Sequence, residues 1–235
     1  MTSHVPAFIK EAYSNDKELH ATSNGLLHFS VHNAGEINLP EGVLVAMDPL
    51  VTVQTRPFSE RVGKGRFPVL LSVARLEKSG EQRLAFAMVR FREEPVIQWQ
   101  LATFVGDDAD QLREDEYIGY GVDSGTGSFM SGATAELLAG ASDRLQKRFS
   151  AQIQKAMQDT YIDTWSWANI DLDETDNNNV VAFSSGWGDG VYPSYFGYGE
   201  SARLCCLVTD FQLVSQPDEE GSSPGQAKKW WQFWK

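Results

Sequence analysis

Four apolar segments follow one another in the first half of the chain, and they constrain the fold more than any other feature. These segments are VLVAMDPLVTVQ (43–54), FPVLLSVARLE (67–77), RLAFAMVRFRE (83–93) and VIQWQLATF (96–104). Each is rich in β-branched and aromatic residues with partial alternation, which is the pattern of β-strands. The intervening KSGEQ (78–82) has the length of a hairpin connection and offers Gly80 for a positive φ angle. The first half therefore predicts a largely antiparallel β-sheet.

The hydrophobic period changes after residue 132. The apolar residues that now recur at steps of three or four, or multiples of them, are Leu138, Ala141, Leu145, Phe149, Ala156 and Tyr161. This spacing predicts one long amphipathic helix over 133–162, with Ser131 or Thr134 as its N-cap. Closing strands are expected in 180–199 and 203–214. One long helix packed on a sheet of six or more strands is an α+β fold.

The composition fits one globular domain with a substantial core, since 42% of the 235 residues are hydrophobic and 22% are charged. We expect a cytoplasmic protein, because the chain has no apolar run of about 18 residues and no basic-then-apolar leader. The adjacent Cys205 and Cys206 predict no disulfide framework. The expected organisation is an N-terminal extension (1–25), a single α+β domain (26–214), a flexible linker (215–227) and a Trp-rich tail (228–235).

The formal net charge is -12, and the body of the chain carries it because the charges in the last twenty residues cancel. A negative field of this size repels phosphate backbones, so we expect no nucleic-acid partner. The same field attracts a cationic protein partner. An acidic surface that serves solubility is the simpler explanation of this charge, and it is the interpretation favoured here.

The segment GYGVDSGTGSFMSG (119–132) places Asp123 in a glycine- and hydroxyl-rich turn. As a plain turn, Asp123 and Ser124 would bond nearby backbone N–H groups while Gly125 and Gly127 take positive φ angles. As the start of a helix, the segment could instead bind an anion, which the Asp123 carboxylate disfavours. The string also resembles the catalytic turn of aspartic proteases, but that mechanism needs two such turns and the chain has one.

The segment SSGWGDG (184–190) surrounds Trp187 and Asp189 with three glycines, which indicates close backbone approach or unusual dihedral angles. It is either a recognition loop, with Trp187 as a platform and Asp189 as a polar anchor, or a bulged hairpin whose aromatics fill a sheet face. The candidate binding residues in the two segments are Ser124, Thr126, Ser185, Trp187, Tyr192 and Tyr195.

The tail KKWWQFWK adds the candidate binding residues Trp230, Trp231 and Trp234. It is interpreted as a docking peptide for a partner's groove, as a segment that packs back on its own body, or as a weak membrane contact through Trp and Lys. No metal site or cofactor is predicted. DLDETDNNN (171–179) lacks the central glycine and terminal glutamate of a calcium loop, and all four histidines precede residue 33, outside every motif.

Several segments occur together in a fixed order: GVLVAMDPLV, GYGVDSGTGSFM, AFSSGWGDGVYPSYFGY and LVTDF. This combination resembles an uncharacterised family of bacterial proteins classed as a domain of unknown function, over roughly residues 26–214. The resemblance implies a bacterial origin and a single domain, and it implies no known activity.

Two classes of function remain. The first is an acidic, non-enzymatic binding protein, for example an immunity-type protein that neutralises a partner protein. The second is a hydrolase in which Asp123 and Asp189 act as acid/base or ligand groups in one cleft. An enzyme requires these carboxylates in a shared pocket with a perturbed pKa, whereas a binding protein requires an exposed patch.

Overall fold

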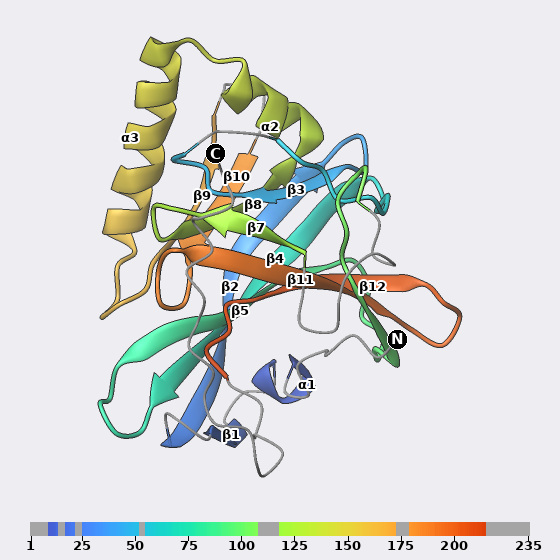
Figure 1. Ribbon diagram of the computed structural model, residues 1–235, viewed down its shortest axis with the longest axis vertical. Coiled ribbons are helices and arrows are strands. Elements are labelled where there is room, and N and C mark those ends of the chain that lie inside the picture. Colours follow the sequence, from blue (N-terminus) through green and yellow to red (C-terminus); the bar gives the residue numbers. More distant parts are fainter. Residues whose placement is uncertain are drawn as a thin grey trace.

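The computed structural model shown in Figure 1 describes residues 9–13, 17–21, 25–51, 55–107, 118–172 and 179–214. The larger of its two sheets has eight strands. In order across the sheet they are β1 (Lys17–Ala21), β2 (Gly25–Leu39), β4 (Gly65–Leu76), β5 (Gln82–Arg90), β12 (Leu204–Asp210), β11 (Gly190–Tyr198) and β6 (Gln98–Leu101), and β7 (Gly119–Val122) pairs with β11 as well. The smaller sheet contains β3 (Leu44–Met47), β8 (Thr126–Ser131), β10 (Asn179–Ser184) and β9 (Trp167–Asp171) in that order.

All neighbouring strands in both sheets run antiparallel, which confirms the predicted α+β class with largely antiparallel strands. The predicted hairpin between β4 and β5 is also present, with Gly80 at a φ of 73°. The strand expected over 43–54 is much shorter, because β3 ends at Met47 and Pro49 cannot donate to a ladder. The strands form two sheets rather than the single sheet expected.

Alternating residues of the strands build three apolar layers. The central cluster lies between the sheets and includes Leu71 and Leu207 from the larger sheet and Phe129 and Phe183 from the smaller one. A second cluster covers the other face of the larger sheet, where α1 (Ile9–Ala12) contributes. The third lies between the smaller sheet and the helices α2 (Gly132–Ala139) and α3 (Asp143–Asp159), as Figure 1 shows.

The prediction of one long helix over 133–162 is wrong, because α2 and α3 are separate helices. Ser131 does cap the first of them, since its Oγ accepts the Thr134 N–H at 3.0 Å. Gly140 ends α2 with its N–H on the Glu136 carbonyl, and Ser142 is the N-cap residue of α3. Glycine has low helix propensity and commonly marks a helix end, which explains the break.

The buried face of α3 also differs from the predicted one. It consists of Phe149, Ile153 and Met157, whereas Leu145 is 40% exposed and Tyr161 is 61% exposed beyond the end of the helix. The predicted periodicity ran across the break at residues 140–142, so it placed the residues on either side of that break on one continuous face. Of the predicted positions, Phe149 is buried on α3 and Leu138 on α2, and Ala141 and Ala156 are partly buried against the same cluster.

An asparagine ladder joins the two sheets. The Asn38 N–H donates to Asn179 Oδ1 at 2.9 Å, and Asn179 Nδ2 donates to the Glu36 carbonyl at 2.8 Å and to Asn169 Oδ1 at 2.9 Å. These bonds link β2 to β10 and β9. Because Asn179 is buried, each of its polar atoms needs such a partner, and the ladder fixes how the smaller sheet sits on the larger.

Several predictions fall on residues that the structure does not describe. The linker 215–227, the tail 228–235 with Trp230, Trp231 and Trp234, and most of 171–179 lie outside the described residues. Within the described part, no helix has both the length and the apolar character needed to cross a membrane.

Candidate functional site

The two glycine-rich segments lie side by side at one end of the sheets. β7 and β11 are paired through Val122↔Gly190, and β8 and β10 are paired through Thr126↔Ser184. The turns that follow these pairs touch, because the Ser185 N–H donates to the Gly125 carbonyl at 3.1 Å. We call residues 123–126 and 185–189 together the twin-turn surface.

A buried carboxylate organises the first turn, and it is Asp48 rather than Asp123. Asp48 Oδ2 accepts the N–H groups of Asp123 at 3.0 Å and Ser124 at 2.7 Å. Its Oδ1 accepts the Ser124 hydroxyl at 2.8 Å and the N–H groups of Leu50 at 2.9 Å and Val51 at 3.2 Å. Five donors therefore satisfy a side chain that is 3% exposed.

The interpretation of Asp123 as a residue that bonds its own turn is wrong. Its side chain is exposed and has no hydrogen-bond or ion-pair partner among the described residues. Gly125 has the predicted positive φ, at 70°, but Gly127 does not, because it lies within β8. Since β8 separates this turn from α2, the turn is also not the start of a helix. Asp48 holds the turn and leaves the Asp123 carboxylate free.

The second turn is closed from below by a tyrosine. Tyr192 Oη donates to the Gly188 carbonyl at 2.7 Å, and Ser185 Oγ donates to the same carbonyl at 2.8 Å. Ser185 and Tyr192 are buried, so both act as supports of the turn. The segment leads from β10 in the smaller sheet to β11 in the larger one, and the bulged-hairpin interpretation is therefore wrong. Gly186 is required here, because a Cβ at this position would lie 2.8 Å from the Cβ of Phe211.

Trp187 stands out of this turn with half of its surface exposed to solvent, at 51%. The Arg83 guanidinium carbon lies 4.7 Å from the centre of its ring. Arg83 is itself held by the Gly186 carbonyl, at 3.2 Å from Nη1, and by an ion pair with Glu81. A cation–π contact of this kind restrains the indole while leaving the rest of its surface open.

The structure brings most of the candidate residues together. Asp123, Ser124, Thr126, Ser185, Trp187, Asp189 and Tyr192 all belong to the twin-turn surface or support it directly. Tyr195 does not, because it is buried in the cluster on the α1 face of the larger sheet. Asp123 and Asp189 directly flank the Val122↔Gly190 pair, and both are exposed to solvent.

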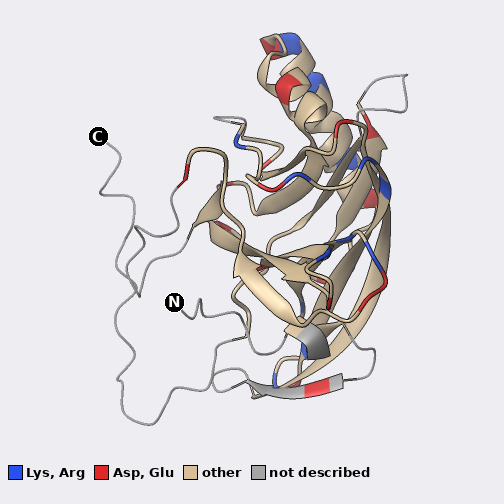
Figure 2. Cartoon of the chain, turned by 90° about the vertical axis from the view of Figure 1, so that its right-hand side faces the viewer, with Lys and Arg blue, Asp and Glu red and all other residues tan. Residues whose placement is uncertain are grey.

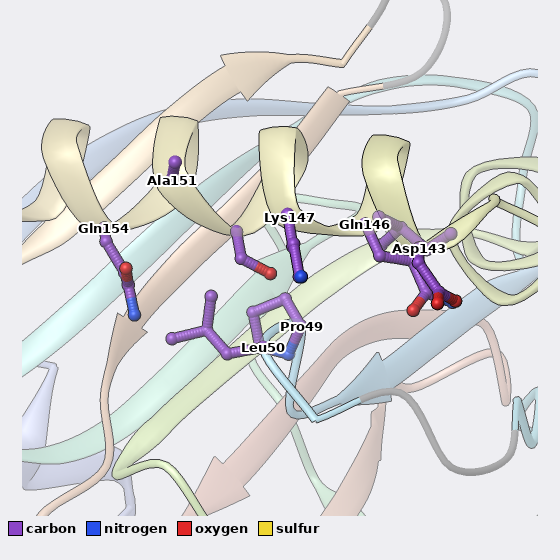
Figure 3. Close-up of a pocket in the computed structure, with 9 residues that line it drawn as sticks. Pro49, Leu50, Asp143, Gln146, Lys147, Ala151 and Gln154 are labelled. Atoms are coloured by element: carbon purple, nitrogen blue, oxygen red, sulfur yellow. The ribbon is translucent and has the colours of Figure 1, made fainter.

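A groove runs along α3 and ends at the first turn. It consists of two shallow hollows of about 440 Å³ and 690 Å³ that share Leu50 and Gln154. Figure 3 shows side chains of α3, including Lys147 and Gln154, pointing toward the loop that carries Pro49 and Leu50. The second hollow is lined by Ser124, Thr126, Gln154, Gln158, Tyr161 and Ser166, together with Leu50 and Met157. We call the two hollows together the α3 groove.

Neither hollow holds an assembled catalytic set. No histidine or cysteine is among the described residues that line them. His32 lies elsewhere, with its ring centre 3.9 Å from that of Trp167, and burial lowers its pKa. α3 carries both signs of charge (Figure 2), with Asp143 and Asp159 at its ends and four Lys and Arg residues between them; Asp143 and Lys147 line the groove.

Sequence reasoning missed Asp48 and the polar row of α3, although both left a signal. Asp48 lies between a short buried strand and Pro49, in the segment VAMDPLV. Polar residues recur every fourth position on α3, at Gln146, Ser150, Gln154 and Gln158, which places them on one flank of the helix. The local sequence does not show which residues these side chains contact, since Asp48 bonds residues that are 75 and 76 positions away.

Comparison with known proteins gives one match. A family model described as "Protein of unknown function (DUF4241)" matches residues 37–209, which is well over half of the chain. The matched span contains Asp48, both turns of the twin-turn surface and α3. No curated protein and no solved structure matches the chain.

Proposed function

The chain belongs to the DUF4241 family, and we propose that it is a non-enzymatic binding protein that recognises a partner protein through the twin-turn surface. Membership confirms the resemblance to an uncharacterised family and supplies no activity. The proposal therefore rests on the chemistry of the surface itself.

The main observation behind this proposal is that the Trp187 side chain is exposed to solvent and yet restrained. Its side chain is half exposed, yet Arg83 restrains it and the bonds of Ser185 and Tyr192 close the turn beneath it. Tryptophan is enriched among the residues that contribute most to protein interfaces, and a preordered side chain loses less entropy on binding. A restrained, exposed indole is the expected form of such an anchor.

Further exposed apolar side chains lie around the twin-turn surface. Val51 follows the loop that Asp48 ties to Ser124, Tyr161 lines the same hollow as Ser124, and Val191 is paired with Gly121 beside the turn. All three side chains are more than one third exposed. Neighbouring exposed apolar groups with polar residues around them are typical of interaction surfaces.

The charge of the chain indicates the kind of partner. Asp123 and Asp189 are exposed beside Trp187 without ion-pair partners among the described residues, and the net charge of the whole chain is -12. Both favour a cationic protein and oppose a nucleic acid. A cytoplasmic immunity-type protein that neutralises a basic toxin would have this chemistry.

The proposal is tested by capturing partners from a lysate of the source cells on immobilised protein. We expect Trp187→Ala to reduce the affinity for a partner captured by the wild type at least tenfold, because loss of a central aromatic anchor costs about 2 kcal/mol or more. Ile97→Ala is the matched control, since Ile97 is 63% exposed and bonds Tyr198 at the far end of β11. Equal affinity of the wild type and Trp187→Ala for every captured protein would contradict the proposal.

A hydrolase is the second candidate, and one observation favours it. Asp123 and Asp189 directly flank the same strand pair, so two carboxylates stand at one end of the β7–β11 ribbon. The test is hydrolysis of chromogenic esters, phosphoesters and glycosides by the wild type and by Asp123→Asn with Asp189→Asn. We expect both proteins to give the same background rate. A wild-type rate that falls at least a hundredfold in the double variant would replace the binding role with catalysis.

A further inference from the structure

The α3 groove is continuous with the twin-turn surface. Its two hollows share Leu50 and Gln154, and the second reaches Ser124 and Thr126 of the first turn. Asp48 holds both sides of this junction, because it bonds the Leu50 N–H as well as Ser124. The groove and the first turn of the twin-turn surface are therefore parts of one face supported by Asp48.

The walls of the groove are rich in neutral donors and acceptors. Gln146, Ser150, Gln154 and Gln158 lie along α3, while Ser124 and Ser166 line the opposite side of the second hollow. Each glutamine amide can donate and accept at once, which matches the alternating N–H and C=O groups of an extended backbone. Leu50, Leu138 and Met157 provide apolar contact between these polar groups.

The dimensions suit a short peptide. At about 1.5 Å per residue, the helix from Gln146 to Gln158 is roughly 18 Å long, which an extended chain spans with five or six residues at about 3.3 Å each. The hollows are shallow and open along their length, whereas sites for small molecules enclose most of the ligand. An extended polypeptide can enter such a groove from the side.

The charges at the two ends of the α3 groove indicate at which end a basic residue of the partner would lie. Asp123 adjoins Ser124, which lines the second hollow, and Asp189 flanks the same Val122↔Gly190 pair; both carboxylates are exposed and have no ion-pair partner among the described residues. The Arg83 guanidinium already lies over the Trp187 ring, so the two carboxylates are the groups that favour a lysine or arginine side chain. At the other end, Asp143 and Lys147 carry opposite charges on α3, so neither sign is favoured there.

We propose that the α3 groove binds an extended segment of the partner protein, with a lysine or arginine of that segment next to Asp123 and Asp189. The inference rests on the proposed function and adds to it the form and charge of the bound segment. The glutamine and serine side chains hold the peptide backbone, and the acidic end of the groove selects the basic side chain.

The probe for this inference is a phage-displayed library of random 12-residue peptides selected against the full chain. Selected peptides are then synthesised, and their affinities are measured by fluorescence anisotropy. We expect these peptides to be enriched in lysine and arginine. Their affinity should fall at least tenfold for Gln154→Trp, which fills the point shared by both hollows. Arg148→Trp is the matched control, because Arg148 is exposed on the same helix and lines neither hollow, and it should change affinity less than twofold.

A thermal melt of each variant precedes the binding measurements, and Gln158→Trp replaces Gln154→Trp if the latter unfolds. The charge selection is tested with Asp123→Asn combined with Asp189→Asn, which should lower the affinity of basic peptides several-fold at low salt and much less at high salt. Failure to enrich any peptide, or equal binding to the wild type and the filled groove, would overturn the inference.

The two proposals fail in different ways. If Trp187→Ala abolishes capture of the cellular partner while Gln154→Trp leaves it intact, the binding role stands and the groove inference is wrong. If Gln154→Trp abolishes capture and Trp187→Ala does not, the groove binds the partner and the role assigned to Trp187 is wrong.

Discussion

Asp48 and Asp210 are both buried aspartates, but their carboxylates differ in how many hydrogen-bond donors surround them. Asp48, at the twin-turn surface, accepts hydrogen bonds from five donors contributed by two loops. Asp210, at the end of β12, accepts one from the described residues, from the Gln212 N–H at 2.7 Å. Burial raises the pKa of Asp210 to about 7, against this one bond that lowers it. The donors around a carboxylate, more than its burial, decide whether its charge stabilises the fold.

A buried tyrosine near Asp210 is also poorly satisfied. Tyr13 follows α1, and its buried hydroxyl has no hydrogen-bond partner among the described residues. Burial raises the pKa of Tyr13 well above its usual value, and the nearby Cys206 and Asp210 raise it further. Asp48 at the twin-turn surface is thus a charge satisfied by its donors, whereas Tyr13 and Asp210 beneath α1 are groups whose neutral forms are favoured by burial. Binding surfaces need the first kind of support, because their side chains must be held in place.

The largest effect on the free energy of unfolding is expected from removing the Asp48 carboxylate, which accepts the five hydrogen bonds at the twin-turn surface. Asp48→Ala leaves the N–H groups of Leu50, Asp123 and Ser124 without their acceptor, and we expect a loss of about 3–5 kcal/mol in the free energy of unfolding. Urea denaturation at pH 7 measures this loss. Asp210→Ala is the comparison, and it should cost clearly less, because one N–H loses its partner. A loss below about 1 kcal/mol for Asp48→Ala would show that the five bonds do not support the turns.

A smaller, pH-dependent effect is expected at Asp210. The carboxyl is protonated in the folded protein up to a pKa of about 7, while in the unfolded chain it ionises near its ordinary value of 3.8. Unfolding therefore releases a proton between these values, and the free energy of unfolding falls as the pH rises through this window, by up to roughly 4 kcal/mol. Asp210→Asn removes the titrating group and should flatten this dependence.

Urea denaturation at pH 4.5, 6, 7 and 8 follows the change. The asparagine variant should be more stable than the wild type at pH 8 and similar to it at pH 4.5. Wild-type and variant stabilities that change in parallel over this range would show that Asp210 is not the group responsible. Cys206 does not titrate in this range, because burial raises its pKa to about 12.

Comparison of the two regions also shows what the sequence can predict. Strands β4 and β5 were predicted nearly to their ends because their apolar alternation is local. Strand β2 was missed, although it is 15 residues long, because its glycine, asparagine and histidine residues interrupt the apolar pattern. Its register shift between Asn33 and Glu36, where Gly35 has a φ of 95°, interrupts the pattern further.

For the candidate site, the sequence predicted residue types better than roles. The two glycine-rich turns were identified as special, and the structure places them in contact. Which aspartate is the support and which is free could not be predicted, because it depends on a contact between Asp48 and a turn 75 residues away. Likewise, the local pattern does not show that Tyr192 points inward to close a turn while Trp187 points outward.

The smallest effect on the free energy of unfolding is expected at Asp123, the aspartate of the first glycine-rich turn. Asp123→Asn keeps the backbone N–H that donates to Asp48 and changes only an exposed side chain that has no partner among the described residues. We therefore expect a change in the free energy of unfolding within about 0.5 kcal/mol, as for most surface substitutions. Ser124→Ala, which removes a hydroxyl bonded to Asp48 at 2.8 Å, should cost about 1 kcal/mol by comparison. If Asp123→Asn proved the more destabilising of the two, the free carboxylate would have a structural partner after all, and its assignment to the binding surface would have to be withdrawn.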